Sequence, residues 1–237
     1  MLTNNQLLKV LGAAFSKYLE FGERSNQKLY VLHGAISRDL MERLGPGYSV
    51  QSLGVNDDRE ESVTGRYMDK KVDITISKNG KVLGGIAVKY VMSNYGQNSN
   101  NYFENMLGET ANIRSGKKAY FQIFIVHKYM PYFKKDGTIS KTEEIKPHHV
   151  AKYIRLSEDN IDSFMHTPTK TLFMLVDHKI KNPRIRTKDD FINFYSNPGN
   201  IDIGLATDNY SFGDTVVYND YQSYIEKVVN YIKFMSN

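Results

Sequence analysis

The chain has 237 residues, of which 41% are hydrophobic and 24% are charged, ordinary values for a globular protein with a sizeable core. It contains no cysteine, which excludes disulfides, thiolate metal sites and thiol nucleophiles. No apolar run reaches the roughly 20 residues that span a bilayer, so we expect no membrane partner. Residues 1–9 lack the order of a signal peptide, and a cytoplasmic location is the expectation. The formal net charge of +5 favours polyanionic partners only mildly.

Apolar periodicity predicts helices at both ends of the chain and strands between them. In chain order we expect a helix over residues 4–21, a helix over 29–44, strands over 48–53, 63–67, 72–76 and 82–91, a polar stretch over 94–101, a helix over 102–114, a buried strand over 119–126, a strand over 172–176, and a closing helix over 221–235. Residues 134–219 are otherwise expected to be mixed loops with a few short elements. This order predicts one domain, residues 1–237, with an α/β (α+β) fold around a mixed sheet.

The chemistry is predicted on the hairpin that Asn79-Gly80 closes. Side chains alternate across a strand, so Val72 and the isoleucines at 74 and 76 should face the core, while Asp73 and Thr75 face the other way. In the partner strand Lys89 belongs to the polar face, so Asp73 and Lys89 should converge. A carboxylate can hold a divalent ion that activates water, and a lysine can orient that water and offset developing charge.

This arrangement resembles the PD-(D/E)XK nuclease superfamily, which contains most type II restriction endonucleases. Val72-Asp73-Ile74 matches the aspartate strand and residues 86–90 match the acidic-x-lysine strand, followed by the helix and strand expected at 102–126. The resemblance covers roughly residues 30–126. It implies a restriction-endonuclease-like mixed central sheet flanked by helices, a prokaryotic source, Mg²⁺ as cofactor, and a homodimer acting on double-stranded DNA. It also implies that Asp73 and the backbone carbonyl of Val88 bind the metal, with Lys89 beside the water.

One position departs from the family pattern, because Ala87 stands where the second acidic metal ligand is expected. An engineered replacement of a glutamate at position 87 would explain this. Alternatively, the carboxylate has moved to the following helix, with Glu104 as the first candidate and Glu109 as the next, or Glu61 ahead of the hairpin supplies it. A naturally inactive DNA-binding descendant, or a mistaken motif, would also explain the alanine.

The polar stretch after Lys89 is a candidate DNA contact, because amide side chains can pair with adenine edges and tyrosines can stack. Its residues, with two basic residues for backbone phosphates, are Asn94, Gln97, Asn98, Asn100, Asn101, Tyr102, Arg114 and Lys117. The other interpretation is a polar loop that reflects composition alone. The six histidines, His33 among them, show no metal-ligand spacing, and we expect ordinary surface or core roles for them.

The sequence thus predicts a Mg²⁺-dependent type II restriction endonuclease that hydrolyses double-stranded DNA at a specific sequence. If no other carboxylate replaces the missing one, the alanine at position 87 has inactivated this enzyme. A repair or mobile-element nuclease with the same core is one alternative. A non-catalytic, sequence-specific DNA-binding protein is the other.

Overall fold

A seven-stranded mixed sheet forms the centre of the computed structural model, which describes residues 1–22, 24–56 and 58–236. The strand order is β1 (Tyr48–Ser52), β4 (Ile74–Lys78), β5 (Lys81–Val91), β6 (Ala119–His127), β9 (Lys170–His178) and β10 (Ile203–Leu205), and β11 (Val216–Tyr218) also pairs with β9. β4 pairs antiparallel with both β1 and β5, whereas β5, β6 and β9 run parallel to one another. The α/β fold with a mixed central sheet flanked by helices is therefore confirmed.

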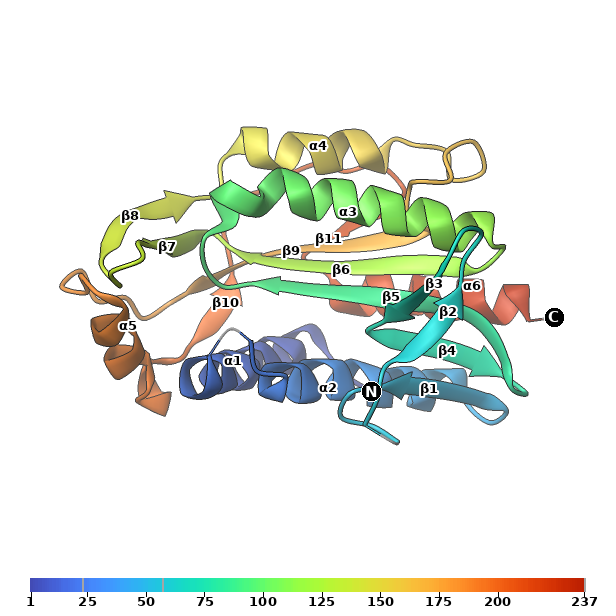
Figure 1. The fold of residues 1–237 in the computed structure, drawn as a ribbon, viewed down its shortest axis with the longest axis horizontal. Coiled ribbons are helices and arrows are strands. Elements are labelled where there is room, and N and C mark those ends of the chain that lie inside the picture. Colours follow the sequence, from blue (N-terminus) through green and yellow to red (C-terminus); the bar gives the residue numbers. More distant parts are fainter. Residues whose placement is uncertain (23, 57, 237) are drawn as a thin grey trace.

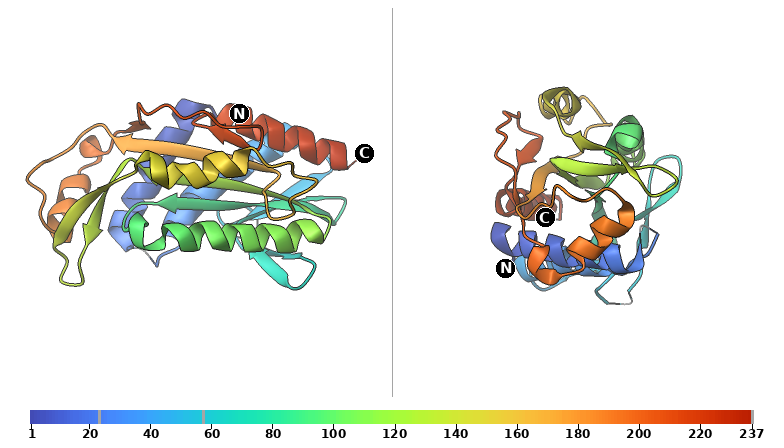
Figure 2. Two further views of the ribbon diagram at one scale, coloured as in Figure 1. Left: turned by 90° about the horizontal axis from the view of Figure 1, so that it is seen from above. Right: turned by 90° about the vertical axis from the view of Figure 1, so that its left-hand side faces the viewer.

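Helices cover both faces of this sheet (Figure 1). On one face α3 (Tyr95–Ser115) and α4 (Pro147–Ser157) lie side by side, as Figure 2 shows from above. On the other face lie α1 (Asn4–Phe21), α2 (Gln27–Leu44) and α6 (Tyr221–Met235). The remaining elements lie outside the sheet: the hairpin of β2 (Glu61–Thr64) and β3 (Asp69–Val72), the hairpin of β7 (Tyr129–Phe133) and β8 (Ile139–Glu144), α5 (Lys188–Tyr195) and the short helix η1 (Pro198–Asn200).

The two faces of the sheet carry separate cores, which explains the apolar patterns of the strands. Ile74 and Ile86 pack with the apolar sides of α1, α2 and α6. Phe124 and Phe173 belong to a second cluster beneath α3 and α4. Every residue of β6 is buried because helices cover both of its faces, so this strand reads as one continuous run in the sequence.

The predicted helices over 4–21 and 29–44 and the Asn79-Gly80 hairpin are confirmed. Asn79 and Gly80 have φ angles of 51° and 76°, the left-handed conformations that a tight two-residue hairpin turn requires. Val72 is buried as predicted, but it does not share the face of Ile74 and Ile76. The chain bends at Asp73 between β3 and β4, so Val72 packs in a small cluster with Val63, apart from Ile74.

Three further expectations need correction. Thr75, predicted to share an outward face with Asp73, is fully buried. The polar stretch 94–101 is helical, since α3 begins at Tyr95 rather than near 102. Residues 134–219, expected as loops with few elements, hold two helices that their short amphipathic patterns conceal, α4 and α5.

Among the described helices, none combines the length and the apolar character needed to cross a bilayer.

Candidate active site at the open edge of β5

The site lies where β5 loses its antiparallel neighbour. Pairing between β4 and β5 ends where Ile74 lies opposite Ile86. The preceding strand, β3, pairs with β2 and does not extend β4 alongside β5. Within the described residues, the stretch of β5 after Ile86 is paired with β6 alone. Two cavities adjoin this stretch, one of about 180 Å³ on the α3 side and one of about 270 Å³ on the α2 side. Asp73, Val88 and Lys89 line both of them.

Asp73 stands at the bend, and its carboxylate takes the place of a strand neighbour. Its Oδ2 accepts a hydrogen bond from the Val88 backbone N–H at 2.7 Å, which fixes the side chain beside β5. Burial raises the pKa of Asp73 to about 6, although the Val88 N–H opposes the shift. The negative charge of Glu109 raises the same pKa further, and Lys89 lowers it. Asp73 is therefore a half-buried carboxylate whose ionised form is disfavoured by desolvation and by the negative charge of Glu109.

Lys89 is exposed on β5 and points toward α3. Its ammonium lies 4.5 Å from the ring centre of Tyr102, a cation–π contact that sets the direction of the side chain. Asp73 and Lys89 thus reach the same cavities, as predicted, although Asp73 does so from the bend and not from an alternating strand.

One stripe of α3 forms the opposite wall of the α3-side cavity. Tyr102, Asn105 and Glu109 recur at helical spacing and all line it. The two carboxylate oxygens of Glu109 are held separately, one by Lys70 at 2.6 Å and the other by the Tyr120 hydroxyl at 3.1 Å. Glu109 is therefore a carboxylate with a fixed position in a cavity that also contains Asp73.

The floor of this cavity is formed by β5 and β6. Ala87 lies directly opposite Gln122 in the parallel register, and both side chains line the cavity. Gln122 is 5% exposed, and its Oε1 has no hydrogen-bond partner among the described residues. Ala87, a small side chain, therefore shares the floor of the cavity with an unsatisfied amide oxygen.

A second group of potential metal-binding side chains lies on the α2 side of Asp73, and two of them, His33 and Asp73, line the α2-side cavity. One potential ligand atom from each of His33, Glu60 and Asp73 lies within 4.8 Å of the other two. His33 comes from α2, and Glu60 comes from the residues that lead into β2. Burial lowers the pKa of His33 to about 4, so its imidazole is neutral at physiological pH and can act as a metal ligand.

The candidates for a relocated carboxylate differ in their distance from the two cavities. Glu104 is exposed, is not among the described residues that line either cavity, and interacts electrostatically with Lys152 of α4. Glu61 is exposed and stands opposite Val72 in the β2–β3 hairpin. Their near neighbours are better placed, because Glu109 lines the α3-side cavity and Glu60 approaches Asp73. The choice of Glu104 as metal ligand is not supported by its position.

The predicted DNA-contacting residues do not form one surface. Their polar amides occupy the first two turns of α3, where several are already bonded within the protein. Asn94 accepts from the backbone N–H of Phe133, Gln97 donates to the Tyr132 hydroxyl, Asn98 donates to the Asn94 carbonyl at 3.5 Å, and Asn100 accepts from Lys152. Asn101 is exposed, and Tyr102 contacts Lys89.

Arg114 and Lys117 lie at the other end of α3, about 30 Å from Asn94 for a helix of 21 residues. The guanidinium of Arg114 donates to the carbonyls of Ile161, Phe164 and Thr167, so it holds the loop after α4. Its interpretation as a phosphate contact is not supported. Lys117 is exposed at the end of the helix in a left-handed conformation.

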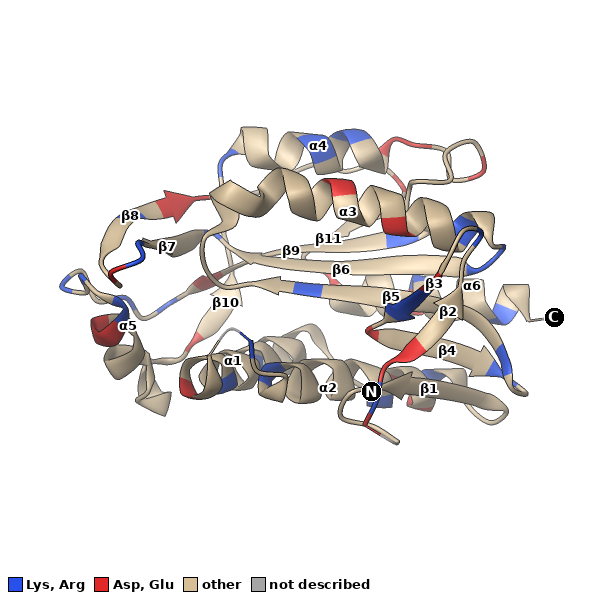
Figure 3. Ribbon diagram, viewed as in Figure 1, with Lys and Arg blue, Asp and Glu red and all other residues tan. Residues whose placement is uncertain are grey.

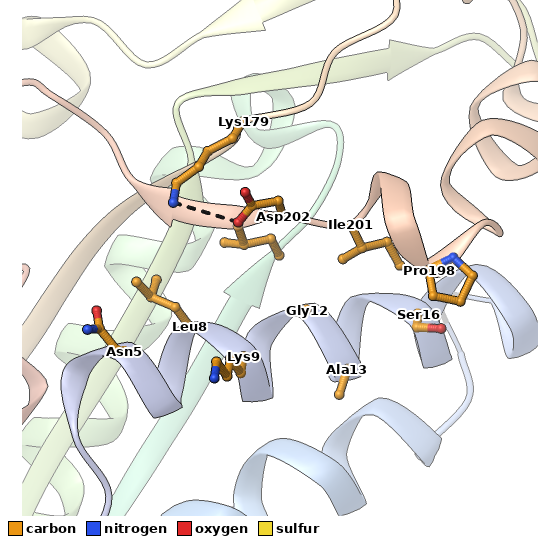
Figure 4. A pocket seen from close by; sticks show the side chains of 11 residues that line it. Asn5, Leu8, Lys9, Gly12, Ala13, Ser16, Lys179, Pro198, Ile201 and Asp202 are labelled. Carbon is orange, nitrogen blue, oxygen red and sulfur yellow. Dashed lines mark ion pairs between the residues drawn. The ribbon is translucent and has the colours of Figure 1, made fainter.

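Charge and cavity size do not point to another site. Basic and acidic residues are interspersed along the ribbon (Figure 3). A larger cavity of about 690 Å³ lies between α1 and the segment of η1 and β10 (Figure 4). Its charged pair, Lys179 and Asp202 at 3.7 Å, is self-compensating, and its α1 wall includes Leu8 and Gly12. Ser16 and Lys9 also line that wall, but among the described residues Asp202 is the only carboxylate of the cavity, and it is already paired with Lys179.

No protein-family model, curated protein or solved structure matches this chain. The nuclease interpretation therefore rests on the site itself. Sequence reasoning placed the aspartate and the lysine but passed over Asn105, Gln122, Glu60 and the role of His33. Helical spacing from Tyr102 would have led to Asn105 and Glu109, and Gln122 is a polar residue inside an otherwise apolar strand. His33 and Glu60 are too far apart in sequence for any spacing rule.

Proposed function

We propose that the chain is a Mg²⁺-dependent endonuclease that hydrolyses phosphodiester bonds in double-stranded DNA. The observation that carries this proposal is the shared cavity of Asp73, Lys89 and Glu109 at the open edge of β5. Two carboxylates and one lysine around one cavity are the groups that metal-assisted phosphodiester hydrolysis requires. Glu109 supplies the second carboxylate, so Ala87 does not by itself exclude activity.

The residues of the cavity fit a hard divalent cation. Carboxylate and amide oxygens are the ligands that Mg²⁺ prefers, and Asp73, Glu109 and Gln122 provide them. The raised pKa of Asp73 shows that burial and Glu109 outweigh the positive charge of Lys89. The unpartnered Oε1 of Gln122 is likewise a buried acceptor without a donor among the described residues. A bound Mg²⁺ would polarise a phosphate and lower the pKa of a coordinated water.

Each remaining role belongs to a residue of the chain. Asp73 and Glu109 hold the cation, and the Val88 N–H keeps Asp73 in position. Lys89 donates to a non-bridging phosphate oxygen and orients the attacking water, which offsets the charge that grows on phosphorus oxygens. The water oxygen forms a bond to phosphorus as the bond to one deoxyribose oxygen breaks, and the water proton passes to solvent. Tyr102 limits the movement of Lys89.

Sequence-specific cutting of both strands, as in type II restriction, would need two such sites, and we propose a homodimer for that reason. The second candidate function is a non-catalytic DNA-binding protein. The Lys70–Glu109 ion pair favours it, because a lysine already neutralises the carboxylate that a metal would need.

Cleavage of supercoiled plasmid DNA with Mg²⁺ tests the proposal. The unmodified chain should cut, Glu109→Gln should abolish cutting, and Glu104→Gln, on the same helix, should leave it unchanged. If only Ala87→Glu cuts, position 87 has lost a native acid and Glu109 does not replace it. If neither form cuts but both bind DNA tightly, the chain is a DNA-binding protein.

A further inference from the structure

Three residues from separate elements converge on the α2 side of Asp73. His33 lies on α2, Glu60 precedes β2, and Asp73 is the bend between β3 and β4. One ligand atom of each lies within 4.8 Å of the other two. A single ion bound between them would draw these atoms closer together. Because each element is part of the folded domain, the chain brings these atoms together before any ligand binds.

The environment of His33 is the second observation that points to a bound ion. Its side chain is completely buried, yet neither ring nitrogen has a hydrogen-bond partner among the described residues. Buried imidazole nitrogens are normally satisfied, so two unsatisfied ones on the same ring need an explanation. One ring nitrogen belongs to the cluster with the Glu60 and Asp73 carboxylates, and a cation there would satisfy it.

We propose that His33, Glu60 and Asp73 form a binding site for a divalent transition-metal ion. One imidazole and two carboxylates suit Mn²⁺, Co²⁺ or Zn²⁺ better than Mg²⁺, which prefers oxygen ligands and retains its waters. The α2-side cavity of about 270 Å³ provides room for waters to complete the coordination. Arg24 and Lys28 line the same cavity, so an anionic group could approach the ion from that side.

This site deepens the proposed function, because Asp73 belongs to both cavities. Two ions that share one carboxylate are a known arrangement for phosphodiester hydrolysis, in which one ion serves the attacking oxygen and the other the leaving oxygen. The metal site itself is defined without DNA, and its test needs no cleavage assay.

Binding of Mn²⁺ to the whole chain, followed by electron paramagnetic resonance in excess Mg²⁺, tests the site. His33→Leu keeps a buried side chain of moderate size but removes both nitrogens, and it should weaken Mn²⁺ binding about tenfold or more. Glu60→Gln should do the same. The matched control His148→Leu, at an exposed histidine, should have no effect, and Glu109→Gln should retain Mn²⁺ binding.

Unchanged Mn²⁺ affinity in both His33→Leu and Glu60→Gln would overturn the proposal. Loss of binding in Glu109→Gln alone would overturn it too, because the ion would then lie on the α3 side. If His33→Leu does not fold by circular dichroism, Glu60→Gln decides. If the chain binds Mn²⁺ through His33 but never cuts DNA, the nuclease proposal is refuted and the metal site is retained. If the chain cuts DNA without such binding, the metal site is refuted and the nuclease proposal is retained.

Discussion

Replacing Asp73 with asparagine should stabilise the protein at neutral pH. The folded state raises the pKa of this carboxyl from 3.8 to about 6, chiefly through burial. Below pH 3.8 the carboxyl is protonated in both the folded and the unfolded state and does not change the free energy of unfolding. Between pH 3.8 and about 6 the folded protein keeps a proton that the unfolded chain has lost, so stability falls as pH rises across this range. At about 1.4 kcal/mol for each pH unit between the two values, the full penalty above pH 6 is about 3 kcal/mol.

Asparagine keeps the size of the side chain and an oxygen that can accept the Val88 N–H, while it removes the charge. Urea unfolding without divalent ions should therefore show Asp73→Asn more stable than the unmodified chain by about 2–3 kcal/mol at pH 7.5, and nearly equal at pH 4. Asp69→Asn, at an exposed carboxylate in β3, is the matched control. A gain of the same size at both pH values, or a loss of stability at pH 7.5, would refute this electrostatic account of Asp73.

Three more predictions follow from the same contacts. Lys89→Met should lower DNA cleavage about 10²–10³-fold in a plasmid assay while DNA binding persists, and unchanged cleavage would remove Lys89 from the reaction. Arg114→Ala should lower the free energy of unfolding by about 1–3 kcal/mol, because three carbonyls lose their donor, and leave DNA affinity in a filter-binding assay unchanged. Mg²⁺ affinity measured by calorimetry should fall as pH drops below about 6, because Asp73 becomes protonated, and a constant affinity from pH 5 to 8 would count against Asp73 as a ligand.

The parts of the fold that the sequence predicts well are those with strong local signals. The helix over 4–21 has apolar residues at regular helical spacing, and the Asn79-Gly80 turn requires left-handed backbone that few other residue pairs adopt. The strand of Lys89 and the buried strand β6 also follow from their patterns. The position of Lys89 depends on these elements and was therefore predictable, whereas Asp73 reaches the same edge from the bend between β3 and β4.

The rest depends on tertiary contacts that leave little local trace. The amide-rich start of α3 appears polar enough for a loop, but Tyr95 is buried there against Phe124 and anchors the helix. Glu104 and Glu109 look equivalent in sequence, and only the rotation of α3 over the sheet directs Glu109 into the cavity. The bend at Asp73 breaks an alternation that sequence reasoning extended through it.

The central claim is that Asp73 and Glu109 hold the same catalytic ion. A double-mutant cycle on Mg²⁺-dependent plasmid cleavage tests it most directly, using Asp73→Asn, Glu109→Gln and both together. If one ion serves both carboxylates, either substitution alone should abolish most of the activity, and the double variant should be hardly slower than each single one. Rate losses that multiply independently, or full activity in Glu109→Gln, would contradict the account.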